Sequence, residues 1–361
     1  MQKVLVISST PYSNSNRGID ILCNAYVKKG YTVDHCVFPA SFFRSKRNRV
    51  REDGDGINQI VTRRRVLGYY ERYMHSLPEN LIRWFVNMAT KFQNLNFDQY
   101  SVVVIESGKP IMLIDRIPRD NINIVYRQSD PMKLLSDNKY MWELEKKVCE
   151  RASLIYIVRE SLKEYIPVEY HPKVVTVVNG FNVENEEPLT LKSDVLSNYD
   201  KHAVYLGYTP IDFKTVDYLC EMHKDVFFNI IGDCLKKSEI NKLRRHSNFK
   251  YYGPLSSKKY LPIIKFSDYG IMPFKDWTAL KHIGLNSKFL LFMKYGLAIV
   301  SYYVGETNEF SNIPIIFCGN KVEFSEALRK LKLKSERMKY DIDFGFYSAG
   351  GRMEEYLEHI L

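Results

Sequence analysis

The sequence lacks the patterns that mark metal proteins and disulfide-stabilised proteins. Its six cysteines include no CxxC pair, and its eight histidines form no cluster at the spacing of metal ligands. We therefore predict reduced, mostly buried thiols in a reducing compartment, with no zinc site and no disulfide framework. The cysteines are Cys23, Cys36, Cys149, Cys220, Cys234 and Cys318.

Long hydrophobic runs are also missing. No stretch approaches the ~18–20 uninterrupted apolar residues that a membrane-spanning helix needs. The first residues, MQKVLVISSTPYS, hold no charged segment followed by a long apolar one, so we expect no signal peptide. These absences predict a soluble or peripheral protein of the cytoplasm.

Positive charge is what the chain has in excess. Of its 361 residues, 45% are hydrophobic and 26% charged, an ordinary globular composition with room for two domains. The formal net charge is +10 and the pI is near 9.0. A basic surface indicates an anionic partner: a nucleic acid, a membrane face or a phosphorylated small molecule.

Short apolar runs alternate with helix-like segments in the first half of the chain. KVLVIS (3–8) reads as a buried parallel strand, residues 19–29 as a helix ended by Gly30, and TVDHCVF (32–38) as the next strand. This order is a βαβ unit. The pattern predicts further strands at 101–107, 123–129, 154–159 and 174–180.

A second βαβ series follows a polar, acidic segment, residues 183–201, which we interpret as a linker. The series predicts a helix at 211–224 and strands at 202–208, 227–232, 250–253, 269–274, 298–302 and 315–319. We therefore expect an α/β protein of two doubly wound, Rossmann-like domains, 1–182 and 202–340, facing across a cleft. A final helical segment, 341–361, could pack back on the first domain. Ligands of such folds lie beyond the carboxyl ends of the strands.

Residues 41–92 form a basic insert with 11 Lys/Arg and five acidic residues, a net charge of +6. Its helical segment ENLIRWFVNMATKF places five apolar side chains on one face: Leu81, Trp84, Phe85, Met88 and Phe92. One interpretation is a helix on an anionic membrane surface, aided by the cluster Arg63, Arg64, Arg65. The other is a helix packed on the sheet beside a solvated basic loop. We interpret Asp53-Gly54-Asp55 as a turn.

The stretch LNSKFLLFMKYG (285–296) predicts a helix that begins at a capping Asn286 or Ser287 and ends at Gly296. Lys288 lies in its first turn, where the helix dipole disfavours a cation. A lysine and a helix N-terminus together suit a diphosphate. The alternative is a surface lysine on an ordinary core helix.

This stretch resembles the nucleotide-sugar segment of GT-B glycosyltransferases, in which Asn/Ser-Lys precedes apolar residues and a small-Gly turn into a strand. VNGFN (178–182) is similar to the family's entry to its second domain, and residues 205–232 and 248–274 resemble successive parts of its nucleotide-binding half. The resemblance implies a GT-B fold and transfer of a sugar from a nucleotide donor.

The sequence departs from the common retaining type at two glutamates, because Ile283 and Leu291 stand at their positions. The smaller branch with the xanthan-type glucuronosyltransferases also lacks the second glutamate, and it inverts the anomeric centre. The aromatic-rich N-terminal half is more similar to that branch.

An inverting transfer needs one general base for the acceptor hydroxyl. In YRQSDP, Asp130 follows a predicted strand, and the inverting branch has a similar Ser-Asp with the aspartate as base. The alternative is an N-cap for a helix at 131–136. Glu106 and Asp20 are further candidate bases.

For the donor, the resemblance implies Asn286, Ser287 and Lys288 at the diphosphate, with Gly207 letting the main chain approach the phosphates. Met272 and Phe274 would flank the base or sugar. Lys275 would meet a phosphate or a sugar carboxylate, or would be an exposed loop lysine. Lys281 and Arg127 are other candidates for a carboxylate.

We therefore expect a metal-independent, inverting glycosyltransferase with no cofactor. It would move a sugar, glucuronic acid among the candidates, from a UDP-sugar to a lipid-linked or polysaccharide acceptor at the inner face of the plasma membrane. The alternatives are a non-catalytic or retaining GT-B relative, or a nucleotide-sugar epimerase, for which His35 is the candidate histidine. No nucleic-acid-binding motif is present, so we expect no nucleic-acid partner.

Overall fold

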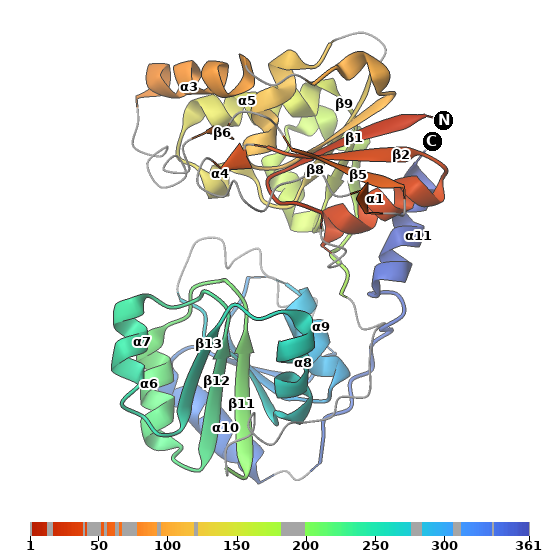
Figure 1. Ribbon diagram of the computed structural model, residues 1–361. Helices are drawn as coiled ribbons and strands as arrows, with labels where there is room; N and C mark the ends of the chain where they lie inside the picture. The colour runs from red at the N-terminus through yellow and green to blue at the C-terminus, as the bar shows by residue number, and fades with distance from the viewer. Residues whose placement is uncertain are drawn as a thin grey trace. The chain divides into compact units, whose positions relative to one another are not determined.

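The computed structural model of the chain contains two compact units (Figure 1). The N-terminal unit comprises Met1–Asn182 and Gly345–Leu361, and the C-terminal unit comprises Val183–Phe344. The residues that the structure describes are 2–12, 17–38, 40–41, 52–53, 56–61, 65–66, 78–91, 95–118, 122–181, 199–275, 284–305, 312–333 and 336–360. Most of the segment 183–201 lies outside them.

An eight-stranded sheet forms the centre of the N-terminal unit, in the order β10-β9-β8-β7-β1-β2-β5-β4. Neighbouring strands are parallel except β4 and β5, which are antiparallel. The strands are β1 (Lys3–Ser8), β2 (Thr32–Val37), β4 (Glu52–Asp53), β5 (Ile57–Val61), β7 (Val102–Glu106), β8 (Asn123–Gln128), β9 (Ala152–Ile157) and β10 (Val174–Thr176). A separate pair joins β3 (Ala40–Ser41) to β6 (Arg65–Val66).

Helices cover both faces of this sheet. On one face, α1 (Gly18–Lys28) and the C-terminal α11 (Ala349–His359) contact each other and pack over Val4 and Val6. The other face carries α3 (Glu79–Lys91), η4 (Lys109–Arg116) and α5 (Lys139–Arg151). Shorter helices are η3 (Phe97–Gln99), α4 (Met132–Leu135), η5 (Glu160–Tyr165) and η6 (Val168–Lys173).

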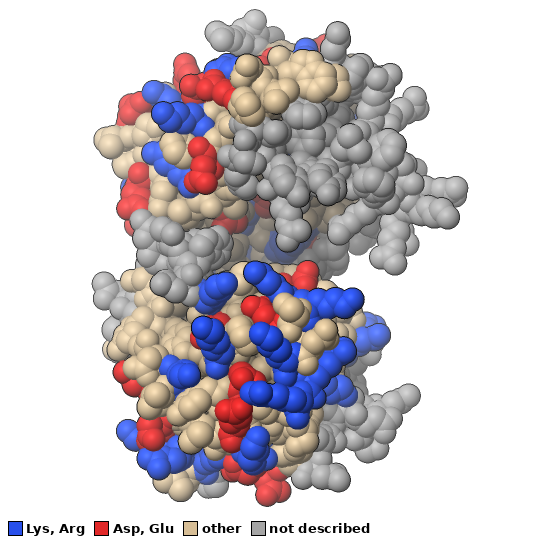
Figure 2. Space-filling model, turned by 90° about the vertical axis from the view of Figure 1, so that its left-hand side faces the viewer, with Lys and Arg blue, Asp and Glu red and all other residues tan. Residues whose placement is uncertain are grey.

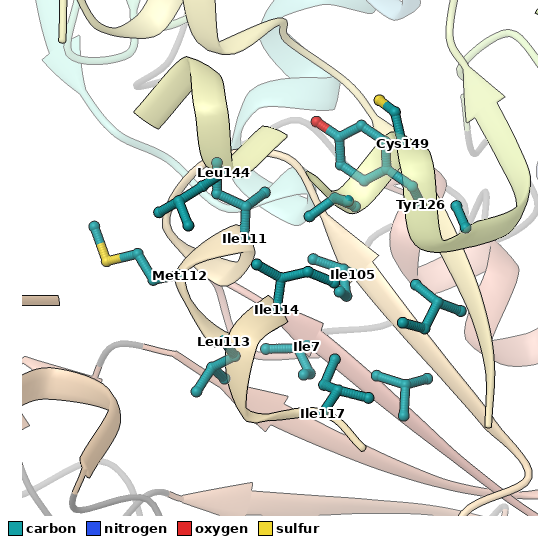
Figure 3. Packing of buried hydrophobic residues seen from close by; sticks show 14 of the residues in the cluster. Ile7, Ile105, Ile111, Met112, Leu113, Ile114, Ile117, Tyr126, Leu144 and Cys149 are labelled. Atoms are coloured by element: carbon teal, nitrogen blue, oxygen red, sulfur yellow. The ribbon is translucent and has the colours of Figure 1, made fainter. Parts of the chain in front are cut away.

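Figure 3 shows the larger core cluster of this unit, where residues of β1, β7 and β8 face those of η4 and α5. Ile7 and Ile105 come from neighbouring strands, and Ile111, Ile114 and Leu144 close over them. All five are completely buried. Because β1 buries residues toward both helical layers, its sequence is a continuous apolar run rather than an alternating one.

The C-terminal unit has a six-stranded parallel sheet in the order β13-β12-β11-β14-β15-β16. The strands are β11 (Lys201–Leu206), β12 (Val226–Ile231), β13 (Phe249–Gly253), β14 (Tyr269–Met272), β15 (Ala298–Tyr302) and β16 (Ile315–Cys318). The helices are α6 (Phe213–Met222), α7 (Lys237–Leu243), α8 (Ser257–Phe266), α9 (Ser287–Lys294) and α10 (Lys321–Lys332). The prediction of two Rossmann-like α/β domains is confirmed.

Each predicted strand has an observed counterpart, but several ends differ. The strands expected at 202–208 and 269–274 end at Leu206 and Met272, and the helical segment expected at 341–361 forms a helix over Ala349–His359. The strand β5, inside the basic insert, was not predicted. The strand expected at 174–180 ends at Thr176. Val177 N still donates to Ile157 O of β9 at 2.8 Å, and the Asn179 side chain beyond it accepts from Arg127 of β8. All six cysteines are buried and free, as predicted. No helix in the described ranges is long and apolar enough to cross a membrane.

The basic insert is described only in part. Arg63 and Arg64 lie outside the described residues, and of Arg65 only the main chain is described, in β6. The strand β4 (Glu52–Asp53) pairs antiparallel with β5, and Gly54 and Asp55 of the predicted turn lie outside the described residues.

The helix α3 turns three residues of its predicted apolar stripe, Leu81, Trp84 and Met88, outward; the side chain of Phe85 and the whole of Phe92 lie outside the described residues. The helix buries Ile82 and Val86 against the unit. Leu81, Trp84 and Met88 are 44%, 51% and 41% exposed, so this apolar stripe lies on the surface of the unit.

Candidate functional site

The carboxyl edge of the N-terminal sheet carries a cluster of polar side chains. The chain leaves β1 toward β2 on one side and returns as β7 on the other, so β1 and β7 flank a switch point where α/β folds bind ligands. Ser8, Glu106 and Gln128 end β1, β7 and β8 at this edge.

Arg127, one residue before the end of β8, is the hub of this cluster. Its side chain is 3% exposed, and Nη1 lies 3.2 Å from Glu106 Oε1 and also donates to Ser129 Oγ. Nη2 donates to Asn179 Oδ1 at 2.7 Å, and Nε donates to the Tyr356 hydroxyl at 3.1 Å. One guanidinium thus joins the ends of β7 and β8, the segment after β10 and the C-terminal helix α11. With these partners it is a structural group, which argues against Arg127 as the ligand of a sugar carboxylate.

Two of the three candidate bases are held in ion pairs with arginines. Asp20, in the first turn of α1, is inaccessible to solvent and accepts from Arg17 at 2.7 and 3.0 Å. Glu106 pairs with Arg127. Burial raises the pKa of Glu106, and the guanidinium groups of Arg127 and Arg17 offset part of that rise.

Asp130 is exposed, in the loop that follows β8. The Oγ of the buried Ser107 accepts from the main-chain N–H groups of Ser129 and Asp130, both at 3.1 Å, and so fastens this loop to the end of β7. Among the three carboxylates, Asp130 is the exposed one, whereas Asp20 is buried and Glu106 is partly buried.

The capping alternative for Asp130 is not what the structure shows. Pro131 stands at the N-cap position of α4, and the helix has no side-chain cap there. Instead the carboxylate of Glu145, from α5, accepts from Met132 N at 3.1 and 3.2 Å. It also accepts from the Tyr126 hydroxyl at 2.6 Å and from Gln128 Nε2 at 3.1 Å. Burial raises the pKa of Glu145, and these hydrogen bonds offset part of the rise.

The carboxyl edge of the C-terminal sheet brings the loops after β11, β12 and β14 together. Lys275 N donates to Pro210 O at 3.0 Å, and Asp212 N donates to Pro273 O at 2.8 Å. A Cβ at Gly232, where φ is +115°, would lie 1.9 Å from the carbonyl oxygen of Gly207. The main chains at Gly207 and Gly232 therefore touch, which only glycine permits at the second position.

Two predicted donor-binding side chains are buried rather than turned to a ligand. Met272 is inaccessible and Phe274 is 4% exposed, with its ring edge-on to Tyr205. Both side chains belong to the packing of the unit, so a contact with a donor would have to come from their main chain. Lys275, the next residue, is exposed.

The helix α9 begins as its sequence predicts. Asn286 caps it, and its Oδ1 accepts from Lys288 N at 2.9 Å and from Phe289 N at 3.3 Å. Ser287 is the first helical residue, and Gly296, with φ +68°, follows the last turn. Leu291, at the position of the retaining glutamate, is buried. Ile283 and Lys281 lie outside the described residues.

Sequence reasoning missed the roles of Arg127, Asn179 and Glu145. The signals were an arginine inside an apolar strand and a glutamate on the inner face of a helix, since buried charges need partners.

His35, the candidate of the epimerase alternative, is inaccessible in β2. In the described part of the chain, Asp217, Glu221 and His246 come together at the spacing of metal ligands, but Arg245 pairs with both carboxylates, at 2.8 and 2.7 Å.

Comparison with known proteins gives one family match. Residues 8–158 match the model of the N-terminal domain of the glucuronosyltransferase GumK. This stretch contains the whole carboxyl edge from β1 to β8, with Asp130. No curated protein matches the chain.

Solved structures match both units. A protein from E. coli described as trehalose-6-phosphate bound with UDP-2-fluoro glucose is 10% identical, covers 99% of this chain and 95% of its own, and has a TM-score of 0.61. Sucrose-phosphate synthase from Thermosynechococcus elongatus is 11% identical, with 99% and 94% covered and a TM-score of 0.64. Arabidopsis thaliana UGT89C1 complexed with UDP-L-rhamnose is 13% identical, with 99% of each chain covered and a TM-score of 0.56. These similarities identify the fold as GT-B.

Proposed function

We propose that the protein is a glycosyltransferase that transfers a sugar from a UDP-sugar to a hydroxyl group of an acceptor, with inversion. The GT-B fold and the match of residues 8–158 to the N-terminal domain of a glucuronosyltransferase support this proposal. Two of the similar structures hold UDP-sugar ligands, which favours the same class of donor here.

The observation that carries the proposal is the placement of Asp130. It is an exposed carboxylate at the carboxyl edge of the N-terminal sheet, inside the matched stretch, on a loop that Ser107 and Glu145 hold from both sides. A general base for an acceptor hydroxyl needs this combination of access and fixed position.

In the proposed reaction, Asp130 accepts the proton of the acceptor hydroxyl as its oxygen attacks the anomeric carbon of the donor. The bond from that carbon to the diphosphate oxygen breaks, and UDP leaves with the bonding electrons. Lys288 and the N-terminus of α9 would stabilise the charge on the leaving diphosphate without a metal ion. The buried Leu291 supports inversion, since it offers no carboxylate where retaining relatives have one.

The sugar and the acceptor are the finer part of the proposal. The family match favours glucuronic acid, and Lys275 is an exposed cation at the loops after β11, β12 and β14 that would pair with its carboxylate. The basic insert and the outward apolar stripe of Leu81, Trp84 and Met88 favour a lipid-linked or polysaccharide acceptor at the inner face of the plasma membrane.

The test is a thermal-shift panel of UDP, GDP, ADP and common UDP-sugars, run with and without EDTA. The proteins are wild type, Lys288→Ala and the matched control Lys294→Ala, at the other end of the same helix. A ligand at ~100 times its Kd stabilises by about 2.7 kcal/mol. We expect the uridine ligands to raise the melting temperature of wild type and Lys294→Ala, with EDTA present or absent, and not that of Lys288→Ala.

Each contrary outcome removes a definite part of the proposal. If no nucleotide stabilises the wild type, the donor class is wrong and a non-catalytic relative is favoured. If Lys288→Ala keeps the full shift, the diphosphate lies elsewhere. If EDTA abolishes the shift, the metal-independent mechanism is wrong.

A further inference from the structure

A second basic segment lies in the C-terminal unit, well apart in sequence from the basic insert. Residues 236–265 contain nine Lys/Arg and a single acidic residue, Glu239, a net charge of +8 compared with +6 for the insert. The basic residues are Lys236, Lys237, Lys242, Arg244, Arg245, Lys250, Lys258, Lys259 and Lys265.

The helix α7 and its two flanking residues carry the densest part of this charge. Lys236, Lys237, Lys242 and Arg244 are all exposed, and we call these four residues the α7 basic surface. Figure 2 shows Lys and Arg side chains gathered on this face of the C-terminal unit, on the side that bears α7 in Figure 1. In the described part of the chain Glu239 forms an ion pair with none of the four; its carboxylate accepts from the main-chain N–H of Lys236 at 2.7 Å.

The α7 basic surface differs from the other charged helices of the same unit. On α10, Arg329 pairs with Glu326 at 2.6 Å, and Lys332 pairs with Asp225 at 2.5 Å. Arg245, which follows α7, pairs with Asp217 and Glu221 of α6. None of the four residues of the α7 basic surface forms an ion pair within the described part of the chain. Their charges therefore face solvent without an ion-pair partner in the described residues, and Lys242 Nζ lies 5.5 Å from the ring centre of Phe213.

The arrangement of these charges indicates an extended anionic partner rather than a single small anion. They are spread over a helix of seven residues, about 10 Å long at 1.5 Å per residue, and do not converge on one point. Three of the four are lysines, which act as mobile point charges, whereas stereospecific binding of phosphates favours the planar fork of arginine. A sheet of lipid headgroups requires no fixed geometry and suits lysine well.

We propose that the α7 basic surface docks the C-terminal unit on a membrane containing anionic phospholipid. This contact is separate from the one proposed for the N-terminal insert and does not depend on the identity of the sugar donor. Each lysine near an anionic bilayer strengthens binding about fivefold, and the attraction decays within a Debye length of about 10 Å at 0.1 M salt.

The experiment is cosedimentation of the full chain with sucrose-loaded vesicles of phosphatidylcholine, with and without phosphatidylglycerol. The surface variant carries Lys236→Gln, Lys237→Gln and Lys242→Gln. The matched control removes the same charge from exposed lysines elsewhere in the C-terminal unit, by Lys321→Gln, Lys330→Gln and Lys339→Gln. A UDP thermal-shift measurement on both variants checks that the unit is folded and reports separately on the proposed function.

We expect the wild type and the control to bind vesicles with phosphatidylglycerol and to release them as salt is raised. The surface variant should bind them on the order of a hundredfold more weakly. Equal binding by the surface variant and the control would overturn the proposal, as would equal binding of the wild type to both kinds of vesicle. It would also be overturned if the wild type bound no vesicles but held an RNA oligonucleotide through the same three lysines.

Discussion

Two neighbouring tyrosines in the N-terminal unit should respond in opposite ways to loss of the hydroxyl group. Tyr356, in α11, is 1% exposed, and its hydroxyl accepts from Arg127 Nε at 3.1 Å. Tyr156, in β9, is also 1% exposed, and its ring meets that of Tyr356 edge-on at 4.9 Å. The Tyr156 hydroxyl has no hydrogen-bond partner within the described part of the chain. Tyr356→Phe and Tyr156→Phe therefore remove the same atom from the same environment, once with a partner and once without.

The magnitudes follow from what each change leaves behind. Tyr356→Phe deprives a buried guanidinium of one acceptor while its bonds to Glu106 and Asn179 remain. A hydrogen bond to a charged group contributes about 1.5–3 kcal/mol, so we expect a loss of about 2 kcal/mol of unfolding free energy. Tyr156→Phe removes a buried polar atom that has no partner, so it should be neutral or should stabilise by about 1 kcal/mol.

The assay is urea unfolding followed by tryptophan fluorescence in a Trp277→Phe background. The remaining Trp84 and Trp142 both belong to the N-terminal unit, so the signal reports on that unit even if the two units unfold separately. In thermal unfolding, the loss in Tyr356→Phe corresponds to roughly 4–8 °C. Equal destabilisation by the two changes would refute the reasoning, because ring packing and not the bond to Arg127 would then determine stability.

Three further predictions concern the two carboxyl edges and the response to acid. Asp130→Asn should lower turnover about 10²–10⁴-fold in an assay with a radiolabelled UDP-sugar and membrane lipid extract. The thermal shift produced by UDP should stay the same. Unchanged turnover would show that Asp130 is not the base. Gly232→Ala should destabilise the C-terminal unit by at least about 2 kcal/mol. The control Gly319→Ala should not, because no atom lies closer than 3.4 Å to the new Cβ. Thermal unfolding of both variants measures the difference. Burial lowers the pKa of His35 from 6.5 to about 4. Between these pH values the unfolded chain binds a proton at His35 that the folded chain does not. The free energy of unfolding should therefore fall by up to about 3 kcal/mol as pH drops from 6.5 to 4. His35→Gln should flatten that slope in urea unfolding at successive pH values, and an unaltered slope would assign it to other groups.

The strands could be predicted because a buried parallel strand has a local signature. KVLVIS and TVDHCVF are short apolar runs separated by a helix that ends at a glycine, and each forms a strand within a residue of its expected bounds. The cap of α9 is equally local, since Asn286 bonds to N–H groups two and three residues later. Such features depend on neighbours in the sequence and need no tertiary information.

The apolar stripe of α3 shows where local pattern fails. Helical periodicity correctly puts Leu81, Trp84 and Met88 on one side, but the side that packs on the unit carries Ile82 and Val86. The sequence therefore left two interpretations open, a membrane-facing stripe and a core-facing one. Periodicity reports which residues share a face, and only the position of α5 and η4 decides which face is covered.

Asp130 illustrates how a distant residue resolves an ambiguity that its own neighbours cannot. An aspartate before a proline and a short helix reads equally well as a cap and as an exposed base. In the structure, the N–H of Met132 at the start of α4 donates to the carboxylate of Glu145, thirteen residues later in the chain. The N–H of Asp130 donates to Ser107 Oγ, at the end of β7. The start of α4 and the N–H of Asp130 are thus satisfied by other residues, so we expect Asp130→Asn to lower turnover more than it lowers stability.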